Sequence, residues 1–145
     1  MDVAQQYIEF KLGNQTYAVK MKYVREIIKP LDITSLLGSP DFVKGVSRVR
    51  DHVITIIDLR NKFKIELSDL TKEEPRIVIL EHEKGTLGLY VDDVVEILES
   101  SSVEQIPNMV HHGVIQEIIK LEESLTPILD VNKLFTEDVT TWLNS

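Results

Sequence analysis

The sequence predicts a mainly β protein made of two small β-barrels packed on each other, and two observations carry this prediction. Short runs of β-branched and aromatic residues recur along the 145-residue chain, separated by turns that contain Gly, Asn or Pro. The second half of the chain also repeats the first with a period of about seventy residues. A unit of this length with about five short strands is too long for a solenoid repeat and suits one small barrel.

The repeat keeps both the order and the spacing of its segments. Three pairs of matching segments define it: residues 24–27 with 94–97, 45–46 with 113–114, and 56–63 with 128–135. We therefore expect a single domain over residues 1–145, with one barrel at about 1–66 and the other at about 75–135. The polar stretch 64–75 is the expected linker, and residues 136–145 are the expected C-terminal tail.

The first elements follow from periodicity. Residues 7–12 alternate apolar and polar side chains, and residues 16–19 resume the alternation after Gly13, which predicts a hairpin with one buried face. The apolar residues between positions 20 and 28 have a helical spacing. We therefore expect a short helix there, leading into an extended segment.

A second hairpin is the most distinctive stretch of the chain. Two β-branched runs, 46–49 and 53–57, flank the polar triplet Arg50-Asp51-His52, which predicts a tight turn. Strand signals in the second half are found at residues 77–80, 86–91, 114–121 and 126–131. A short helical tail within 131–143 is expected to cover an apolar surface at the end of the chain.

This second hairpin and its exit concentrate positive charge. Between Lys44 and Lys64 there are six basic and two acidic residues, whereas the whole chain has a formal net charge of −8. Such a segment is a candidate docking surface for an acidic partner, although charged strand residues also commonly face solvent without a partner. We call its basic residues the basic island: Lys44, Arg48, Arg50, Arg60, Lys62 and Lys64.

Composition excludes several classes of function. The absence of cysteine excludes a disulfide framework, a thiolate nucleophile and cysteine-ligated metals, and it makes the cytoplasm the expected compartment. No stretch reaches the roughly 20 apolar residues of a membrane span, so we expect no direct membrane insertion. With a pI near 5.0, the chain lacks the general basicity that nucleic-acid binding requires.

Familiar catalytic and metal-binding motifs are absent from the sequence. Neighbouring residues of a strand point to opposite faces, so the pair His111-His112 does not supply two ligands for one metal ion. The same argument applies to Asp92-Asp93, which we expect in a solvated loop or at a helix start. We therefore expect neither a metal ion nor an organic cofactor.

Asp58 and Asp130 occupy equivalent positions in the repeat, each after an apolar strand. One interpretation is a symmetric catalytic pair, as in a small hydrolase or isomerase. The interpretation that we favour is structural: each carboxylate accepts hydrogen bonds from backbone N–H groups of the following turn.

An ordered set of residues points to one family. In the first half these are Phe10, Leu12, Gly13, Tyr17, Val24, Glu26, Ile27, Pro40, 42–46, Arg50, Val53, Ile54, 57–60 and Phe63. In the second half they are Gly88, Val91, Asp92, Val94, Ile97, Gly113, Val114, Leu129 and Asp130. With this set the chain resembles, over nearly its whole length, the chemotaxis coupling proteins, the CheW-like domain family. No single motif is diagnostic, but the ordered set is specific.

The resemblance implies a fold of two packed five-stranded SH3-like barrels with short helices. It also implies a non-enzymatic cytoplasmic adaptor that couples chemoreceptors, the methyl-accepting chemotaxis proteins, to the regulatory domain of the histidine kinase CheA. By position, five residues are expected to contact the kinase or the receptor hairpin tip: Val24, Glu26, Gly45, Arg50 and Ile97. Val24 and Ile97 are expected to lie near each other in a groove between the barrels.

Two residues beside Arg50 depart from the family pattern. Asp51 stands where the family usually has Gly, and Asp adopts a left-handed backbone less readily than Gly. Thr55 stands where the family usually has Pro, and it gains a backbone donor and suits a strand. An alternative function is coupling in another receptor–kinase array, in gliding or pilus signalling, and partner identity separates the two.

Overall fold

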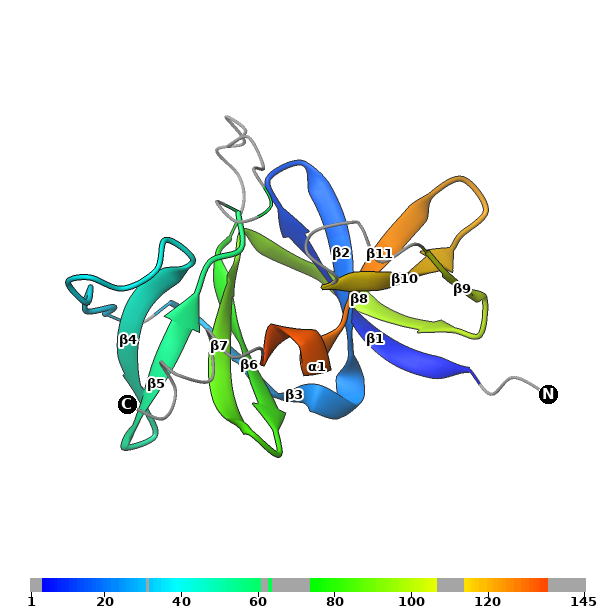
Figure 1. Ribbon diagram of the computed structural model, residues 1–145. Coiled ribbons are helices and arrows are strands. Elements are labelled where there is room, and N and C mark those ends of the chain that lie inside the picture. Colours follow the sequence, from blue (N-terminus) through cyan, green and yellow to red (C-terminus); the bar gives the residue numbers. More distant parts are fainter. Residues whose placement is uncertain (1–3, 31, 61–62, 64–73, 107–113, 136–145) are drawn as a thin grey trace.

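The protein is described by a computed structural model in residues 4–30, 32–60, 63, 74–106 and 114–135. These residues form two β-sheets (Figure 1). The six-stranded sheet runs in the spatial order β8 (Asp93–Ser100), β1 (Gln5–Leu12), β2 (Gln15–Lys20), β11 (Leu125–Leu129), β10 (Ile115–Lys120), β9 (Val103–Gln105). The five-stranded sheet runs in the order β3 (Val24–Ile28), β6 (Arg76–His82), β7 (Gly85–Val91), β5 (His52–Ile57), β4 (Val43–Val49).

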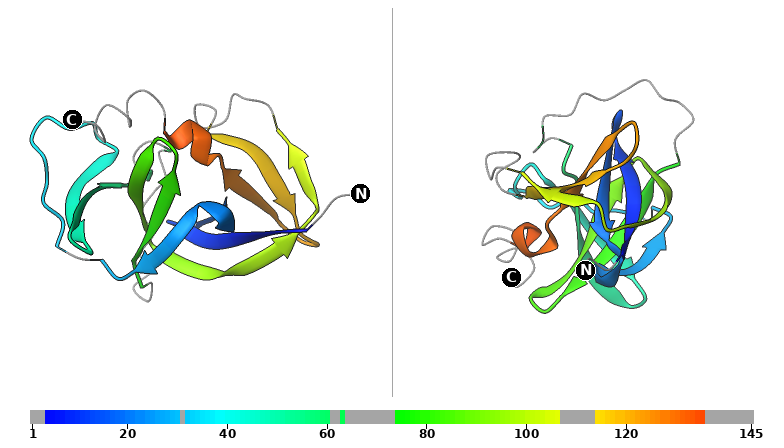
Figure 2. Two further views of the ribbon diagram at one scale, coloured as in Figure 1. Left: turned by 90° about the horizontal axis from the view of Figure 1, so that it is seen from below. Right: turned by 90° about the vertical axis from the view of Figure 1, so that its right-hand side faces the viewer.

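Each sheet curls into a small barrel, and the two barrels lie side by side (Figures 1 and 2). The short helix α1 (Val131–Leu134) follows β11 and lies against β6. The prediction of a mainly β fold with two packed barrels is therefore confirmed. The described part of one sheet has six strands rather than five, because the short strand β9 extends it.

The expected barrel boundaries at 1–66 and 75–135 are wrong, because the two halves exchange strands. The first half places its hairpin β1–β2 in the six-stranded sheet and β3, β4 and β5 in the five-stranded sheet. The second half places its hairpin β6–β7 in the five-stranded sheet and β8, β10 and β11 in the six-stranded sheet. Parallel pairing of β5 with β7 and of β11 with β2 joins the halves. Each barrel thus requires both halves of the chain.

Three apolar clusters hold this arrangement together. The largest contains side chains from both sheets, among them Phe10 of β1 and Leu87 of β7, so it forms the junction between the barrels. A smaller cluster with Ile77 and Ile79 belongs to the five-stranded barrel, and a third with Tyr7 belongs to the six-stranded barrel. Strands such as β6 are buried on both faces, which explains their nearly continuous apolar sequence.

One local expectation is corrected. Of the helix expected within 20–28, only a 3₁₀ turn at Met21–Tyr23 forms, and Val24–Ile28 is strand β3. Pairing of β3 with β6, together with the β-branched residues Val24, Ile27 and Ile28, outweighs the helical spacing. Residues 64–73 of the expected linker and the tail 136–145 lie outside the described residues.

Candidate partner-binding surface

The turn between β4 and β5 has two residues. Val49 pairs with His52, and between them Arg50 and Asp51 have φ angles of 49° and 68°. Positive φ at both central residues is the geometry of a type I′ turn, whose twist matches that of the flanking strands. The expected tight turn is therefore confirmed, but His52 belongs to β5 rather than to the turn.

Arg50 and Glu26 form an ion pair. The Nε atom of Arg50 lies 3.1 Å from Oε1 and 2.9 Å from Oε2 of Glu26. Glu26 belongs to β3 at one edge of the five-stranded sheet, and Arg50 follows β4 at the other edge. The pair therefore bridges the two edges where the barrel closes. The Arg50 side chain is 69% exposed and that of Glu26 is 20% exposed, so the guanidinium is the more accessible partner.

Gly45 is buried and positions the hairpin through its backbone. A Cβ atom at this position would lie 2.2 Å from the carbonyl oxygen of Thr34. Thr34 exchanges two backbone hydrogen bonds with Val46, at 2.8 and 2.9 Å. Gly45 thus allows the chain around Thr34 to lie directly against β4, and it offers no side chain to a partner.

Val24 and Ile97 lie on edge strands of different sheets. Val24 of β3 is half-buried and packs on the junction cluster. Ile97 of β8 is 59% exposed, and Val95 on the same strand is 44% exposed. All five expected contact residues are described. A direct bond joins Glu26 and Arg50, and Ile97 forms an exposed apolar patch with Val95 on β8.

The basic island is less continuous than the sequence indicated. Lys44 lies over the Tyr90 ring with its Nζ 4.4 Å from the ring centroid, and Arg48 is exposed on β4. Arg60, in contrast, is held in an internal ion-pair network and does not add to the exposed charge. Lys62 and Lys64 lie outside the described residues.

The network around Arg60 joins the two barrels. The Arg60 terminal nitrogens lie 2.6 Å from Oδ2 of Asp58 and 2.8 Å from Oδ1 of Asp92. Asp92 connects β7 of one barrel to β8 of the other, and its Oδ2 accepts a hydrogen bond of 2.6 Å from the Gly13 backbone N–H. Asp92 is therefore buried in an ion pair, which corrects the expectation of a solvated loop. The sequence offered no signal that would link Asp92 to Arg60, which lies thirty-two positions earlier.

The ion pairing also changes proton affinities. Burial raises the pKa of Asp58, but hydrogen bonds from Arg60 and the positive charges of Arg60 and Lys44 outweigh burial and hold the pKa below its ordinary value. The hydrogen bond to Asp58 raises the pKa of Arg60 in turn, against the opposing effect of burial. A carboxylate held ionised by a buried guanidinium serves structure better than acid–base catalysis.

The expected capping roles are confirmed. Oδ1 of Asp58 accepts a hydrogen bond of 2.9 Å from the Arg60 backbone N–H. Asp130 is the N-cap of α1, and its side chain accepts a bond of 3.4 Å from the Lys133 backbone N–H.

The described residues contain no cluster of three or more His, Asp or Glu side chains that could hold a metal ion. His111 and His112 are not among them. No helix in the described ranges is long and apolar enough to cross a membrane.

Known proteins are similar to this chain in sequence and fold. The family model of the CheW-like domain matches residues 6–139. The chain is 28% identical to the Chemotaxis protein CheW of Treponema pallidum, over 90% of this chain and 82% of that one. Its identity to the Klebsiella aerogenes protein of the same name is 30%, over 94% and 84%. Protein PilI of Pseudomonas aeruginosa is 36% identical over 60% of this chain and 48% of its own.

A solved structure supports the same assignment. The scaffolding protein TtCheW from Thermoanaerobacter tengcongensis superposes with a TM-score of 0.82 at 26% identity, covering 94% of this chain and 90% of that one. The family model and the two-barrel fold thus agree over almost the whole sequence. This chain belongs to the CheW-like domain family.

Proposed function

We propose that this protein is a non-enzymatic adaptor that couples chemoreceptors to the histidine kinase CheA in bacterial chemotaxis. The observation that carries the proposal is the family match across residues 6–139, which includes relatives named chemotaxis proteins and a structural neighbour described as a scaffolding protein. The adaptor acts in the cytoplasm, at membrane-bound receptor arrays, without entering the membrane itself.

Arg50 is the central polar contact in this proposal. Glu26 engages its Nε atom, so the two terminal nitrogens remain available as donors, and no other bond of Arg50 is found among the described residues. A guanidinium fixed in direction loses less conformational freedom when it binds a carboxylate or backbone carbonyls of a partner. Gly45 contributes indirectly, because it sets the position of the hairpin that carries Arg50.

Ile97 is the central apolar contact. It lies with Val95 on β8, an edge strand of the six-stranded sheet, where both side chains are exposed. Exposed apolar residues on an edge strand suit an apolar partner such as the tip of a receptor hairpin. Val24 has a structural part in this proposal, because it packs on the apolar cluster at the junction between the barrels.

A second candidate is coupling in another receptor–kinase array, in gliding or pilus signalling. The observation that favours it is the match to Protein PilI, which has a higher identity than the two CheW proteins named above but covers a shorter stretch. A small acid–base enzyme gains no such support, because Asp58 and Asp92 are bound to Arg60 and Asp130 caps α1.

Reconstitution of the ternary complex tests the proposal. The protein is mixed with the CheA kinase and a receptor cytoplasmic fragment from its own organism, and autophosphorylation of the kinase is followed. We expect receptor-dependent kinase activation only when the protein is present. Binding to neither CheA nor the receptor fragment would contradict the proposal, and binding only to components of another array would favour the second candidate.

A further inference from the structure

A pocket of about 330 Å³ opens where β5 and β7 stop pairing. These parallel strands pair only between Thr55–Ile57 and Leu87–Leu89. The residues just before these segments, 52–54 and 85–86, instead line the pocket. The backbones of the two strands therefore separate at this end of the barrel and leave a slot between them.

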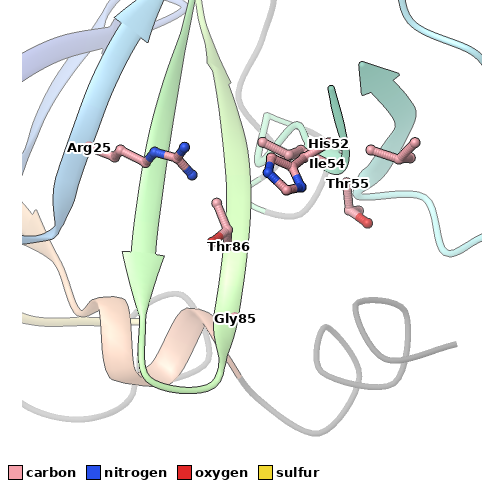
Figure 3. A pocket seen from close by; sticks show the side chains of 7 residues that line it. Arg25, His52, Ile54, Thr55, Gly85 and Thr86 are labelled. Carbon is pink, nitrogen blue, oxygen red and sulfur yellow. The ribbon is translucent and has the colours of Figure 1, made fainter. Parts of the chain in front are cut away.

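The pocket lining is rich in hydrogen-bond donors and has no carboxylate. Arg25 contributes a guanidinium, His52 an imidazole, and Thr55 and Thr86 hydroxyl groups. Figure 3 shows Arg25 and Thr86 on the β3 and β7 side and His52 and Thr55 on the β5 side. In a chain with a net charge of −8, such a lining selects for an anionic group.

One acidic residue does approach Arg25 from outside the pocket. Oε2 of Glu81 lies 4.0 Å from the Nε atom of Arg25, and both side chains are exposed. An exposed ion pair at this distance contributes little, so it does not hold the guanidinium against a competing carboxylate. Arg25 is thus able to make a bidentate contact with a bound anion.

An apolar side chain lies beside this polar pocket. Val53 also lines it and is 69% exposed. A free inorganic anion gains nothing from an exposed valine, whereas a peptide can pack an apolar side chain on it. Gly85 on the opposite strand has no side chain to obstruct an approaching backbone.

We propose that this pocket binds the carboxylate of an Asp or Glu side chain in an extended segment of a partner protein. Arg25 and His52 hold the carboxylate, the hydroxyls of Thr55 and Thr86 supply further donors, and an apolar neighbour of the acidic residue packs on Val53. No pocket residue is among the five expected receptor and kinase contacts. The proposal therefore goes beyond the proposed function and does not depend on it.

A capped pentapeptide of sequence Thr-Val-Glu-Val-Thr provides the test, with its Gln counterpart as the neutral control. Each is titrated into the ¹⁵N-labelled full chain while amide NMR signals are recorded. We expect saturable shifts at residues 52–55 and 85–86 with the Glu peptide. Loss of a charged hydrogen bond corresponds to about tenfold in affinity, so the Gln peptide should bind about tenfold more weakly.

Two variants separate specific recognition from general attraction. Arg25→Gln removes the guanidinium and should weaken the Glu peptide about tenfold. Lys29→Gln removes the same charge just beyond β3, outside the pocket lining, and should change affinity by less than about twofold. Thr86→Val tests the hydroxyl contribution, and the dispersion of each variant's spectrum reports whether it is folded.

Several outcomes would overturn the proposal. These are equal binding of the Glu and Gln peptides, shifts that map outside the pocket, equal effects of Arg25→Gln and Lys29→Gln, or no binding of the Glu peptide. Inorganic phosphate serves as a further ligand. If phosphate produced the same shifts at lower concentration than the peptide, the pocket would be a site for small anions and the peptide proposal would be wrong.

Discussion

Arg50 and Glu26 connect the two edges of the five-stranded barrel: the Nε atom of Arg50 lies 2.9 Å from Oε2 of Glu26. Arg50 reaches this position from a turn residue with a φ of 49°. The contact gives the guanidinium a defined direction on the surface, while 69% of the side chain stays exposed. The same residue is therefore both a closing contact of the barrel and a candidate contact for a partner.

Arg50→Glu should leave the fold intact and weaken kinase or receptor binding by at least about 2 kcal/mol. An interface arginine can be a hot spot, and the reversal adds repulsion to the lost bond. The stability cost should stay below about 1 kcal/mol because the Arg50 side chain is 69% exposed. Titration calorimetry and thermal unfolding measure the two effects.

Arg48→Glu is the matched control, since Arg48 is an exposed arginine of the same hairpin. It should weaken binding much less. The double variant Glu26→Arg with Arg50→Glu restores the ion pair with reversed polarity, so it should recover stability but not binding. Equal losses for Arg48→Glu and Arg50→Glu would leave only a diffuse electrostatic role for the basic island.

Ile97→Ala should reduce receptor binding with little change in melting temperature. The side chain is 59% exposed, so its truncation creates no internal cavity. Val24→Ala is the contrasting variant, because Val24 packs on the junction cluster and its loss should cost about 1 kcal/mol of stability. Receptor pull-downs beside thermal melts compare them, and wild-type binding by Ile97→Ala would remove Ile97 from the contact surface.

The sequence contains the repeat and predicts the two barrels, but it does not predict that the two halves of the chain exchange strands. A repeat shows that Val24 and Val94 occupy equivalent positions, yet it does not say with which hairpin each segment pairs. That choice depends on contacts between distant residues, such as the parallel pairing of Thr55 with Leu87. The expected closeness of Val24 and Ile97 stays a prediction, and their strands lie at the edges of different sheets.

Those features of the candidate site that depend on local sequence could be predicted. The turn at Arg50 and Asp51 and the caps at Asp58 and Asp130 follow from local sequence, and the structure confirms them. The burial of Asp92 was not predictable, because it depends on Arg60 arriving from a strand end thirty-two positions earlier.

Asp51→Gly should stabilise the protein by about 0.5–1 kcal/mol. Asp51 has a φ of 68°, a left-handed conformation that is unfavourable for a non-glycine residue. Glycine is a preferred residue at this position of a type I′ turn. The larger conformational freedom of glycine in the unfolded chain offsets part of this gain. Urea unfolding measures the change. A loss of stability would show that the Asp51 side chain makes a favourable contact of its own.

Glu9→Gln should stabilise the protein at neutral pH, by about 0.5–1 kcal/mol. Glu9 pairs in register with Glu96, and among the described side chains its Oε2 is the buried polar atom without a partner. Burial, and then the charge of Glu96, raise the pKa of Glu9. The folded chain therefore binds its proton more tightly than the unfolded chain does, and the ionised form is the destabilising one.

The destabilisation caused by ionised Glu9 depends on pH. It is fully present above the raised pKa of Glu9, and it disappears as the pH falls below the ordinary glutamate pKa. The gain in unfolding free energy from Glu9→Gln, measured by chemical denaturation, should become smaller over the same range of pH. Glu99→Gln is the control, because Glu99 faces the neutral Gln6 in the register. An advantage that did not depend on pH would contradict this origin.

Arg60→Gln should be the most destabilising of these changes, at about 3–5 kcal/mol, because it leaves the carboxylates of Asp58 and Asp92 buried without their counter-charge. The lowered pKa of Asp58 gives wild type a stabilisation that is fully present above the ordinary aspartate pKa and is lost as the pH falls through the folded value. The difference in unfolding free energy between the variant and wild type should therefore become smaller in acid.

Arg76→Gln is the control. Arg76 pairs with the exposed Glu74, so this substitution should cost less than about 1 kcal/mol. Urea unfolding at neutral pH and near pH 3 measures both variants, and equal losses would show that the Arg60 network does not hold the barrels together.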